Sequence, residues 1–196
     1  APDAPEYVYY TSFEDSAASG FVGVGGFQIG TPDYEFGPEA VSGANCWGTN
    51  LTGVYDNTAS LSLTSPVFNI SDLLNPMLQI NHWYSIESYW DGGNVKMSAD
   101  SGATWTLLLP EDDYPEDEVY TGNTGIPGEQ AFSGTSNGNF WHTVQFSIDS
   151  LSGADTLIQF RFDFGSDASV QYAGWYIDDF ALMDNISNRD IDGELN

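Results

Sequence analysis

Hydrophobic and polar side chains alternate along several segments of this chain, which is the pattern of a β-strand that buries one face. The alternation is clearest in residues 77–86, 140–148 and 156–164, where apolar or aromatic side chains recur at every second position. We therefore predict that these segments are strands around one core, with the intervening side chains directed outward. The side chains expected to face outward are Gln79, Asn81, Trp83, Trp141, Gln145, Gln159, Arg161 and Asp163.

Glycine and proline set the length of the predicted strands. The 21 Gly and 9 Pro residues separate short segments, and turns about every 8–12 residues are typical of a β-sandwich. We predict an all-β fold, a two-sheet antiparallel β-sandwich (jelly roll), over residues 7–183. Residues 1–6 are expected to be a linker or mature N-terminus, and residues 184–196 a polar C-terminal tail. Further strands are expected at residues 7–14, 45–51, 59–65, 94–99 and 104–109, with a long irregular region at residues 110–139.

Charge narrows the classes of partner. The chain has 3 Lys and Arg against 29 Asp and Glu, for a formal net charge of −26. Such a surface repels phosphate backbones and anionic lipids, so we expect no nucleic acid partner. No apolar run approaches the ~18 residues of a spanning helix, so no membrane insertion is expected. The acidity suits divalent cations and an exported protein, which predicts a secreted, extracellular or cell-surface location.

Two adjacent carboxylates, Asp178 and Asp179, lie within a segment that is apolar on both faces. Buried carboxylates are costly unless they are paired or bound to a metal, and the chain offers few cationic partners. We therefore predict that Asp178 and Asp179 help to hold a calcium ion. Strand alternation places them on opposite faces, so only one is expected to bind the ion directly while the other orients a neighbour.

A second pair of acids, Glu87 and Asp91, lies four residues apart at a strand end before two glycines. Oxygen ligands from a strand end and its following loop are those that calcium prefers. The alternative is that Asp91 only caps the turn. His82 and His142 lie on apolar strand faces, and we interpret them as core residues rather than zinc ligands or bases.

Enzyme motifs are missing from the sequence. We find no G-x-S-x-G, H-E-x-x-H, P-loop or Rossmann pattern, and with 29 acids a carboxylate pair carries little information. Residues 98–105 fit the Asp-box pattern S-x-D-x-G-x-T-W, in which the Asp caps a turn and Gly takes a positive φ. The single Cys46 excludes an internal disulfide and is expected to be a small buried residue. We therefore predict that the chain is not an enzyme.

The outward side chains suggest where a ligand binds. Aromatic faces beside amides and an arginine would suit a sugar on an exposed sheet face. The alternative is that long loops cover these faces and that the tryptophans pack beneath them. The candidate ligand-binding residues are Trp83, Trp141, Asn81, Gln145 and Arg161.

Short motifs spread over residues 7–183 resemble the MAM-like jelly-roll domains of the immune inhibitor A, choice-of-anchor and cleaved-adhesin type. The resemblance implies a jelly roll with structural Ca²⁺ that serves as a non-catalytic module of a secreted bacterial protein. Carried over position by position, it points to Glu14 with Asp178 or Asp179, with Asp15 as a possible addition. The matching motifs are 13–15, 46–51, 63–66, 82–84 with Glu87 and Asp91, 91–93, 98–105, 161–162, 166–167 and 174–179.

We therefore expect a calcium-stabilised extracellular binding or adhesion module that takes a carbohydrate or protein ligand and belongs to a larger secreted or surface protein. The alternative hypothesis is a self-assembling structural subunit of an extracellular filament, tube or surface layer, whose partners are copies of itself.

Overall fold

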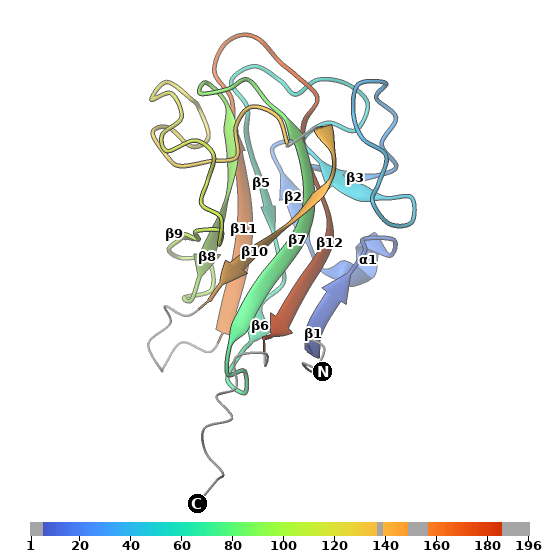
Figure 1. The fold of residues 1–196 in the computed structure, drawn as a ribbon, viewed down its shortest axis with the longest axis vertical. Coiled ribbons are helices and arrows are strands. Elements are labelled where there is room, and N and C mark those ends of the chain that lie inside the picture. Colours follow the sequence, from blue (N-terminus) through green and yellow to red (C-terminus); the bar gives the residue numbers. More distant parts are fainter. Residues whose placement is uncertain (1–5, 137–138, 149–156, 186–196) are drawn as a thin grey trace, which may run out of the picture.

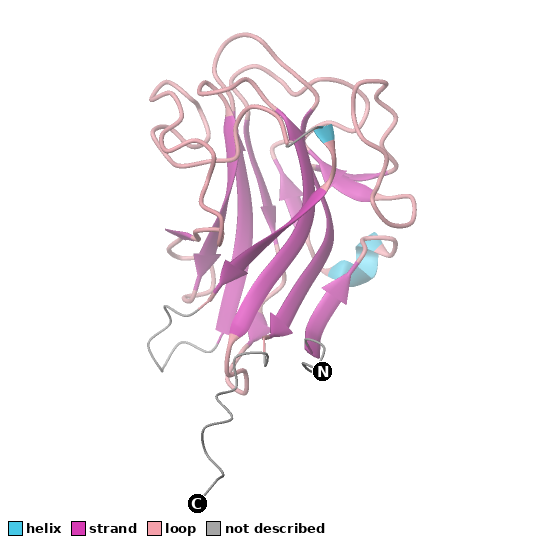
Figure 2. Cartoon of the chain, in the orientation of Figure 1, coloured by secondary structure: helices cyan, strands magenta, loops and turns pink. Residues whose placement is uncertain are grey.

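The computed structural model describes residues 6–136, 139–148 and 157–185, which form twelve strands and one short helix, α1 (Ser16–Ser19). Figure 2 shows that strands and loops make up almost the whole of this part of the chain. The strands are β1 (Glu6–Thr11), β2 (Val22–Val24), β3 (Gln28–Gly30), β4 (Cys46–Gly48), β5 (Ser60–Thr64), β6 (Phe68–Asn69), β7 (Pro76–Ser85), β8 (Gly92–Ser98), β9 (Thr106–Leu107), β10 (His142–Ser147), β11 (Leu157–Gly165) and β12 (Gly174–Asp184).

Two six-stranded antiparallel sheets pack against each other (Figure 1). One sheet has the order β10-β7-β12-β4-β3, with β1 beside β12, and is called sheet A here. The other, sheet B, has the order β2-β5-β11-β8-β9, with β6 beside β11. The predicted all-β, two-sheet antiparallel β-sandwich is confirmed.

Aromatic side chains from both sheets fill the core. The alternating Phe160, Phe162 and Phe164 of β11 are fully buried. Phe180 of β12 reaches across from sheet A, and its ring centroid lies 5.8 Å from that of Phe68 and 5.8 Å from that of Phe160. Burial of such rings is the main favourable term in folding, and period-two alternation supplies it here.

The outer face of sheet A carries a second, smaller apolar layer. Cys46, Trp83 and Tyr176 are buried there, and Tyr34 and Ala40 pack against them from segment 31–45. A side chain that alternation predicts to point outward, such as Trp83, is therefore covered by a loop. The alternative interpretation of this face, that long loops cover it, holds at Trp83.

A β-bulge interrupts β12 and overturns the prediction that Asp178 and Asp179 face opposite ways. The β7–β12 register shifts between Asp178 and Ala181, and Asp179 has a φ of 49°. Such a bulge adds one residue and re-aims the side chains beside it. Asp178 Oδ2 accepts from the Ser42 amide at 3.2 Å and Asp179 Oδ1 from the Ser42 hydroxyl at 2.7 Å, so both carboxylates reach the same loop.

The first and the last strand of the described chain pair with each other in sheet A. β1 begins at Glu6 and pairs with β12, which ends at Asp184. Residues 1–5 of the predicted linker and residues 186–196 of the predicted tail lie outside the described residues. In the part of the chain that the structure describes, no helix has the length and hydropathy needed to cross a bilayer.

Candidate functional site

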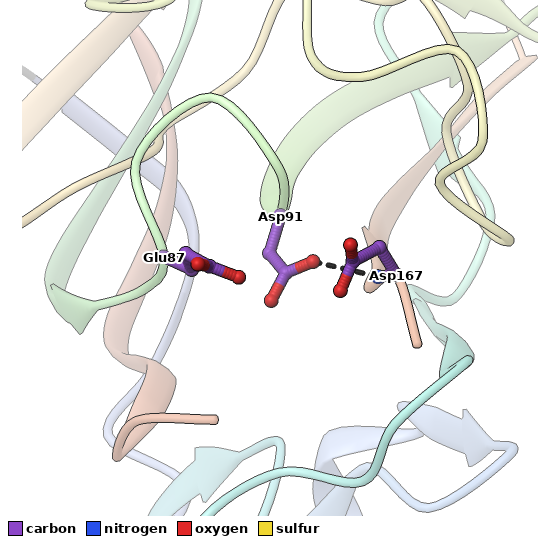
Figure 3. Close-up of side chains that lie close together, drawn as sticks. All are labelled: Glu87, Asp91 and Asp167. Carbon is purple, nitrogen blue, oxygen red and sulfur yellow. Dashed lines mark hydrogen bonds between the residues drawn. The ribbon is translucent and has the colours of Figure 1, made fainter. Parts of the chain in front are cut away.

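Three carboxylates, Glu87, Asp91 and Asp167, meet where β7 and β11 end and β8 begins (Figure 3). Glu87 follows β7, Asp91 directly precedes β8 and Asp167 follows β11. Gly92 of β8 pairs with Gly165 of β11, so the antiparallel register carries Asp91 and Asp167 to the same edge. One ligand oxygen from each residue lies within 4.8 Å of the other two.

Hydrogen bonds fix the loop that carries two of these acids. The Asp91 amide donates to the Glu87 carbonyl at 3.1 Å, and the buried Ser133 hydroxyl lies 3.2 Å from that carbonyl and 2.7 Å from the Asp91 carbonyl. The hydroxyl of the buried Tyr55 donates to Asp91 Oδ2 at 2.7 Å, while the Asp167 amide donates to Asp91 Oδ1 at 2.7 Å. The site is therefore preorganised around Asp91.

Burial and mutual repulsion disfavour the charged forms of the carboxyl groups in this site. Asp91 is fully buried, and burial raises its pKa to about 6, with the charges of Asp167 and Glu87 adding to the effect. Burial also raises the pKa of Glu87, again with a contribution from Asp167. Glu87 Oε2 is buried without a hydrogen-bond partner. Groups in this arrangement call for a proton or a cation.

The protein provides no cation here from its described residues. Lys96 pairs with Glu129 at 2.7 Å and Asp163 at 3.1 Å, and Arg161 pairs with Asp163 at 2.7 Å, all on the outer side of sheet B. Three oxygen donors with one orphaned oxygen fit a hard metal ion, whose ligands are carboxylates and carbonyls. Glu87, Asp91 and Asp167 can therefore hold a metal ion together.

Glu14 and Asp15, predicted as metal ligands, accept hydrogen bonds from backbone amides, and neither belongs to a group of three acids that could hold a metal within the described residues. Glu14 Oε1 accepts from the amides of Ala44 and Asn45 at 2.9 and 2.7 Å. Asp15 caps α1 by accepting from the Ala18 amide at 3.1 Å.

Asp178 and Asp179 also hold segment 31–45. Asp178 Oδ2 accepts from the Val41 amide at 3.0 Å, and burial raises the pKa of this carboxyl to about 7. Asp179 accepts from the Tyr10 hydroxyl at 2.6 Å and from Asn81 Nδ2 at 2.9 Å. Within the described residues, the three-carboxylate arrangement occurs only at Glu87, Asp91 and Asp167.

The predicted ligand-binding residues do not share one surface. Trp83, Asn81, Gln145 and Trp141 lie on the outer side of sheet A, whereas Arg161 belongs to β11 of sheet B. Period-two alternation tells which face of a strand is buried but not which sheet contains the strand.

The four residues on sheet A differ in what they offer a ligand. Trp83 is 2% exposed, and its indole donates to the Asn139 carbonyl at 3.0 Å. The Thr143 hydroxyl donates to Asn81 Oδ1 at 2.7 Å, and Gln145 Nε2 donates to Gln79 Oε1 at 2.8 Å, so these groups are already hydrogen-bonded within the sheet. Trp141 remains partly exposed.

Trp141 lines a groove of about 440 Å³ with residues 37–41, Trp83, Asn139 and Phe140. Phe140 is 73% exposed, and the Trp141 indole donates to the Glu39 carbonyl at 2.8 Å. The groove therefore offers the Trp141 indole, which is held by a hydrogen bond, and the exposed ring of Phe140.

The two histidines bind each other. His82 is fully buried and its Nε2 lies 2.8 Å from Nε2 of His142, which faces it across β7 and β10. Phe132, Tyr84 and Trp175 pack around the His82 ring. His82 is therefore a core residue, as expected, whereas His142 is only half-buried.

Comparison with known proteins gives a fold and a distant relative. No family model matches the chain. The K1 cleaved adhesin domain of Lys-gingipain from Porphyromonas gingivalis W83 superposes with a TM-score of 0.53 at 14% identity, covering 89% of this chain and 96% of that domain. The K2 cleaved adhesin domain gives a TM-score of 0.52 at 12% identity, with coverage of 89% and 96%. The fold is thus that of a cleaved adhesin domain.

Bacillopeptidase F of Bacillus subtilis (strain 168) is 30% identical over 189 residues, which are 93% of this chain. The chain spans only 11% of the length of that protein. The relationship is therefore to one segment of a much longer protein.

Asp167 was missed as a site residue. It appeared in the sequence only as part of a matching motif, next to Ser166. Its role depends on the pairing of Gly92 with Gly165, which brings two loops 76 residues apart into contact. An antiparallel pairing of the segments that end at Gly165 and begin at Gly92 would have been the signal.

Proposed function

We propose that this chain is a calcium-stabilised, non-catalytic binding or adhesion module of a secreted or cell-surface protein. The observation that carries the proposal is the group Glu87, Asp91 and Asp167 on a cleaved-adhesin fold. Calcium is the favoured ion because all three ligands are oxygens and because carbonyls border the site. Zinc is disfavoured because the nitrogen and sulfur ligands typical of its sites do not occur in this group.

The role of the ion in this proposal is to hold the loops together. It would join the loop between β7 and β8 to the loop after β11, and it would neutralise three carboxylates that now repel one another. An ion that binds only the folded state at 100 times its dissociation constant adds ~2.7 kcal/mol of stability.

Melting in the presence of calcium and of a chelator tests this proposal. We expect a lower melting temperature with chelator for the wild type and no calcium response in Glu87→Gln. Asp112→Asn is the matched control, because it removes an exposed acid outside the group and should keep the full response. An unchanged calcium response in Glu87→Gln would place the ion elsewhere.

The ligand surface in this proposal is the groove that contains Trp141 and Phe140. Its aromatic rings suit a carbohydrate face or an apolar side chain of a protein ligand. A glycan array and a protein-binding screen with Trp141→Ala, compared with the control Tyr172→Ala at an exposed aromatic residue outside the groove lining, test this surface. A ligand that binds both variants alike would exclude the groove.

Self-association is a second candidate, favoured by one observation. Within the described residues β1 pairs only with β12, and Tyr7 and Tyr10 beside its free edge are 56% and 52% exposed. An unpaired apolar edge is a template for strand addition. Sedimentation over a wide concentration range tests it, and a monomer at every concentration would exclude it.

A further inference from the structure

Three aromatic side chains form a cluster at the surface: Tyr89 and Trp90 in the loop between β7 and β8, and the half-buried Tyr120 in the region between β9 and β10. The ring centroids of Tyr89 and Trp90 are 5.4 Å apart, and those of Trp90 and Tyr120 are 4.6 Å apart. Tyr89 is 46% exposed and Trp90 39% exposed. Grouped aromatic rings at a surface mark interaction sites more often than single exposed apolar residues do.

Backbone hydrogen bonds hold this cluster rigid. The Tyr89 amide donates to the Ser133 hydroxyl at 3.0 Å, and the Tyr120 amide donates to the Tyr89 carbonyl at 2.7 Å. Asn123, which is 3% exposed, donates through Nδ2 to the Trp90 carbonyl at 3.0 Å. A backbone fixed in this way loses little conformational freedom when a ligand binds.

Tyr89 also has a strained backbone. Its φ is 73°, in the left-handed region that bulky residues rarely adopt. Such strain persists only where the surroundings enforce it, and it concentrates at functional sites. Here the strain accompanies an outward-facing ring, in a place where a glycine would relieve it.

The electrostatic surroundings of the cluster are acidic. The exposed Asp117 and Glu118 closely precede Tyr120, and these acids lie outside the group assigned to the metal ion. The described cations, Lys96 and Arg161, are already paired with Asp163 of sheet B, and Lys96 also with Glu129. With a net charge of −26, this surface attracts cations.

We propose that Tyr89, Trp90 and Tyr120 form a docking surface for an arginine- or lysine-bearing segment of a partner protein, with the cationic group over the Trp90 ring. Aromatic faces attract guanidinium and ammonium groups, and tryptophan does so best. The neighbouring acids add charge complementarity that a neutral sugar would not use. This surface shares no residue with the Trp141 groove, and it rests on the proposed role as a binding module without requiring calcium.

Fluorescence anisotropy with a labelled peptide of alternating Arg and Gly tests the proposal, with the same peptide carrying Glu in place of Arg as the first control. The variant Trp90→Leu keeps every charge and an apolar side chain, so it isolates the ring. We expect it to weaken binding of the Arg peptide by about two- to thirtyfold, whereas the matched variant Phe36→Leu, at an exposed ring outside the cluster and outside the groove lining, should bind as the wild type does.

Equal binding of the Arg peptide by Trp90→Leu and the wild type would overturn the proposal, because charge alone would then explain the affinity. Binding of neutral xylo- or malto-oligosaccharides that Trp90→Leu abolishes would also overturn it, in favour of a sugar site. If Trp90→Leu fails to fold, the indole NMR signal of Trp90 in the wild type decides, since it must shift when the Arg peptide is added. Loss of calcium response or of groove binding would leave these outcomes unaffected, so the two proposals fail separately.

Discussion

Acidification should destabilise the sandwich through His82. The Trp175 indole can only donate, and it lies 3.2 Å from His82 Nδ1, so this nitrogen accepts and the proton of neutral His82 lies on Nε2. His82 Nε2 then donates to His142 Nε2 at 2.8 Å, and the His142 proton on Nδ1 faces the Phe140 carbonyl at 3.4 Å. A proton added to His82 Nδ1 would remove the acceptor of the hydrogen bond from the Trp175 indole.

The size of the effect follows from proton linkage. Burial, together with the neighbouring His142, lowers the pKa of His82 well below its ordinary value of 6.5. Below about pH 6.5 His82 is therefore protonated in the unfolded chain but remains neutral in the folded chain, so the free energy of unfolding falls as the pH falls. At about pH 5, one such histidine costs ~2 kcal/mol relative to neutral pH.

Urea unfolding of the wild type and His82→Gln at neutral pH and at about pH 5 tests this reasoning. The variant is expected to be less stable at neutral pH, but the wild type should lose ~2 kcal/mol more on acidification. Comparing the two removes the contribution of the carboxylates, which are common to both proteins. Parallel losses of stability in the two proteins would refute a buried neutral His82.

Two further predictions concern packing. Phe180→Ala should lower the free energy of unfolding by ~3–5 kcal/mol, because the ring is fully buried, whereas Phe36→Ala, at a ring 67% exposed, should change it by less than ~0.5 kcal/mol. Gly165→Ala should cost ~1–3 kcal/mol, because its methyl group would collide with Asn123 Oδ1. Gly53→Ala meets its nearest atom at an ordinary 3.6 Å and should be nearly neutral. Urea unfolding measures all four, and equal stability of the two glycine variants would contradict the predicted collision.

Alternation was sufficient to predict the strands that carry the core, because one buried face imposes a period of two. β7, β10 and β11 were found in this way, and the Asp-box turn is confirmed by the Thr104 amide and hydroxyl, which donate to Asp100 at 2.8 and 2.6 Å. The pairing of strands is a property of register across the sheet, which alternation does not contain. For that reason the sequence did not show that Arg161 lies on a different sheet from Trp83.

The bulge at Asp179 illustrates a second limit. The positive φ of Asp179 turns its side chain to the same face as that of Asp178, and the residues around it give no signal of this in the sequence. The same limit applies to the candidate metal site. Glu87 and Asp91 are close in sequence and could be paired by spacing alone, whereas Asp167 joins them only through the β8–β11 register.

Because segment 31–45 covers the outer face of sheet A, the rate at which Cys46 reacts with thiol reagents reports the opening of that segment. Its thiol is fully buried beneath segment 31–45, and burial raises its pKa, so thiol reagents react only when that segment lifts. The labelling rate of the only cysteine in the chain therefore measures how often the Asp178 and Asp179 tethers release. A ligand bound in the groove beside residues 37–41 would lower the labelling rate of Cys46, so the natural cysteine can report binding without an engineered probe.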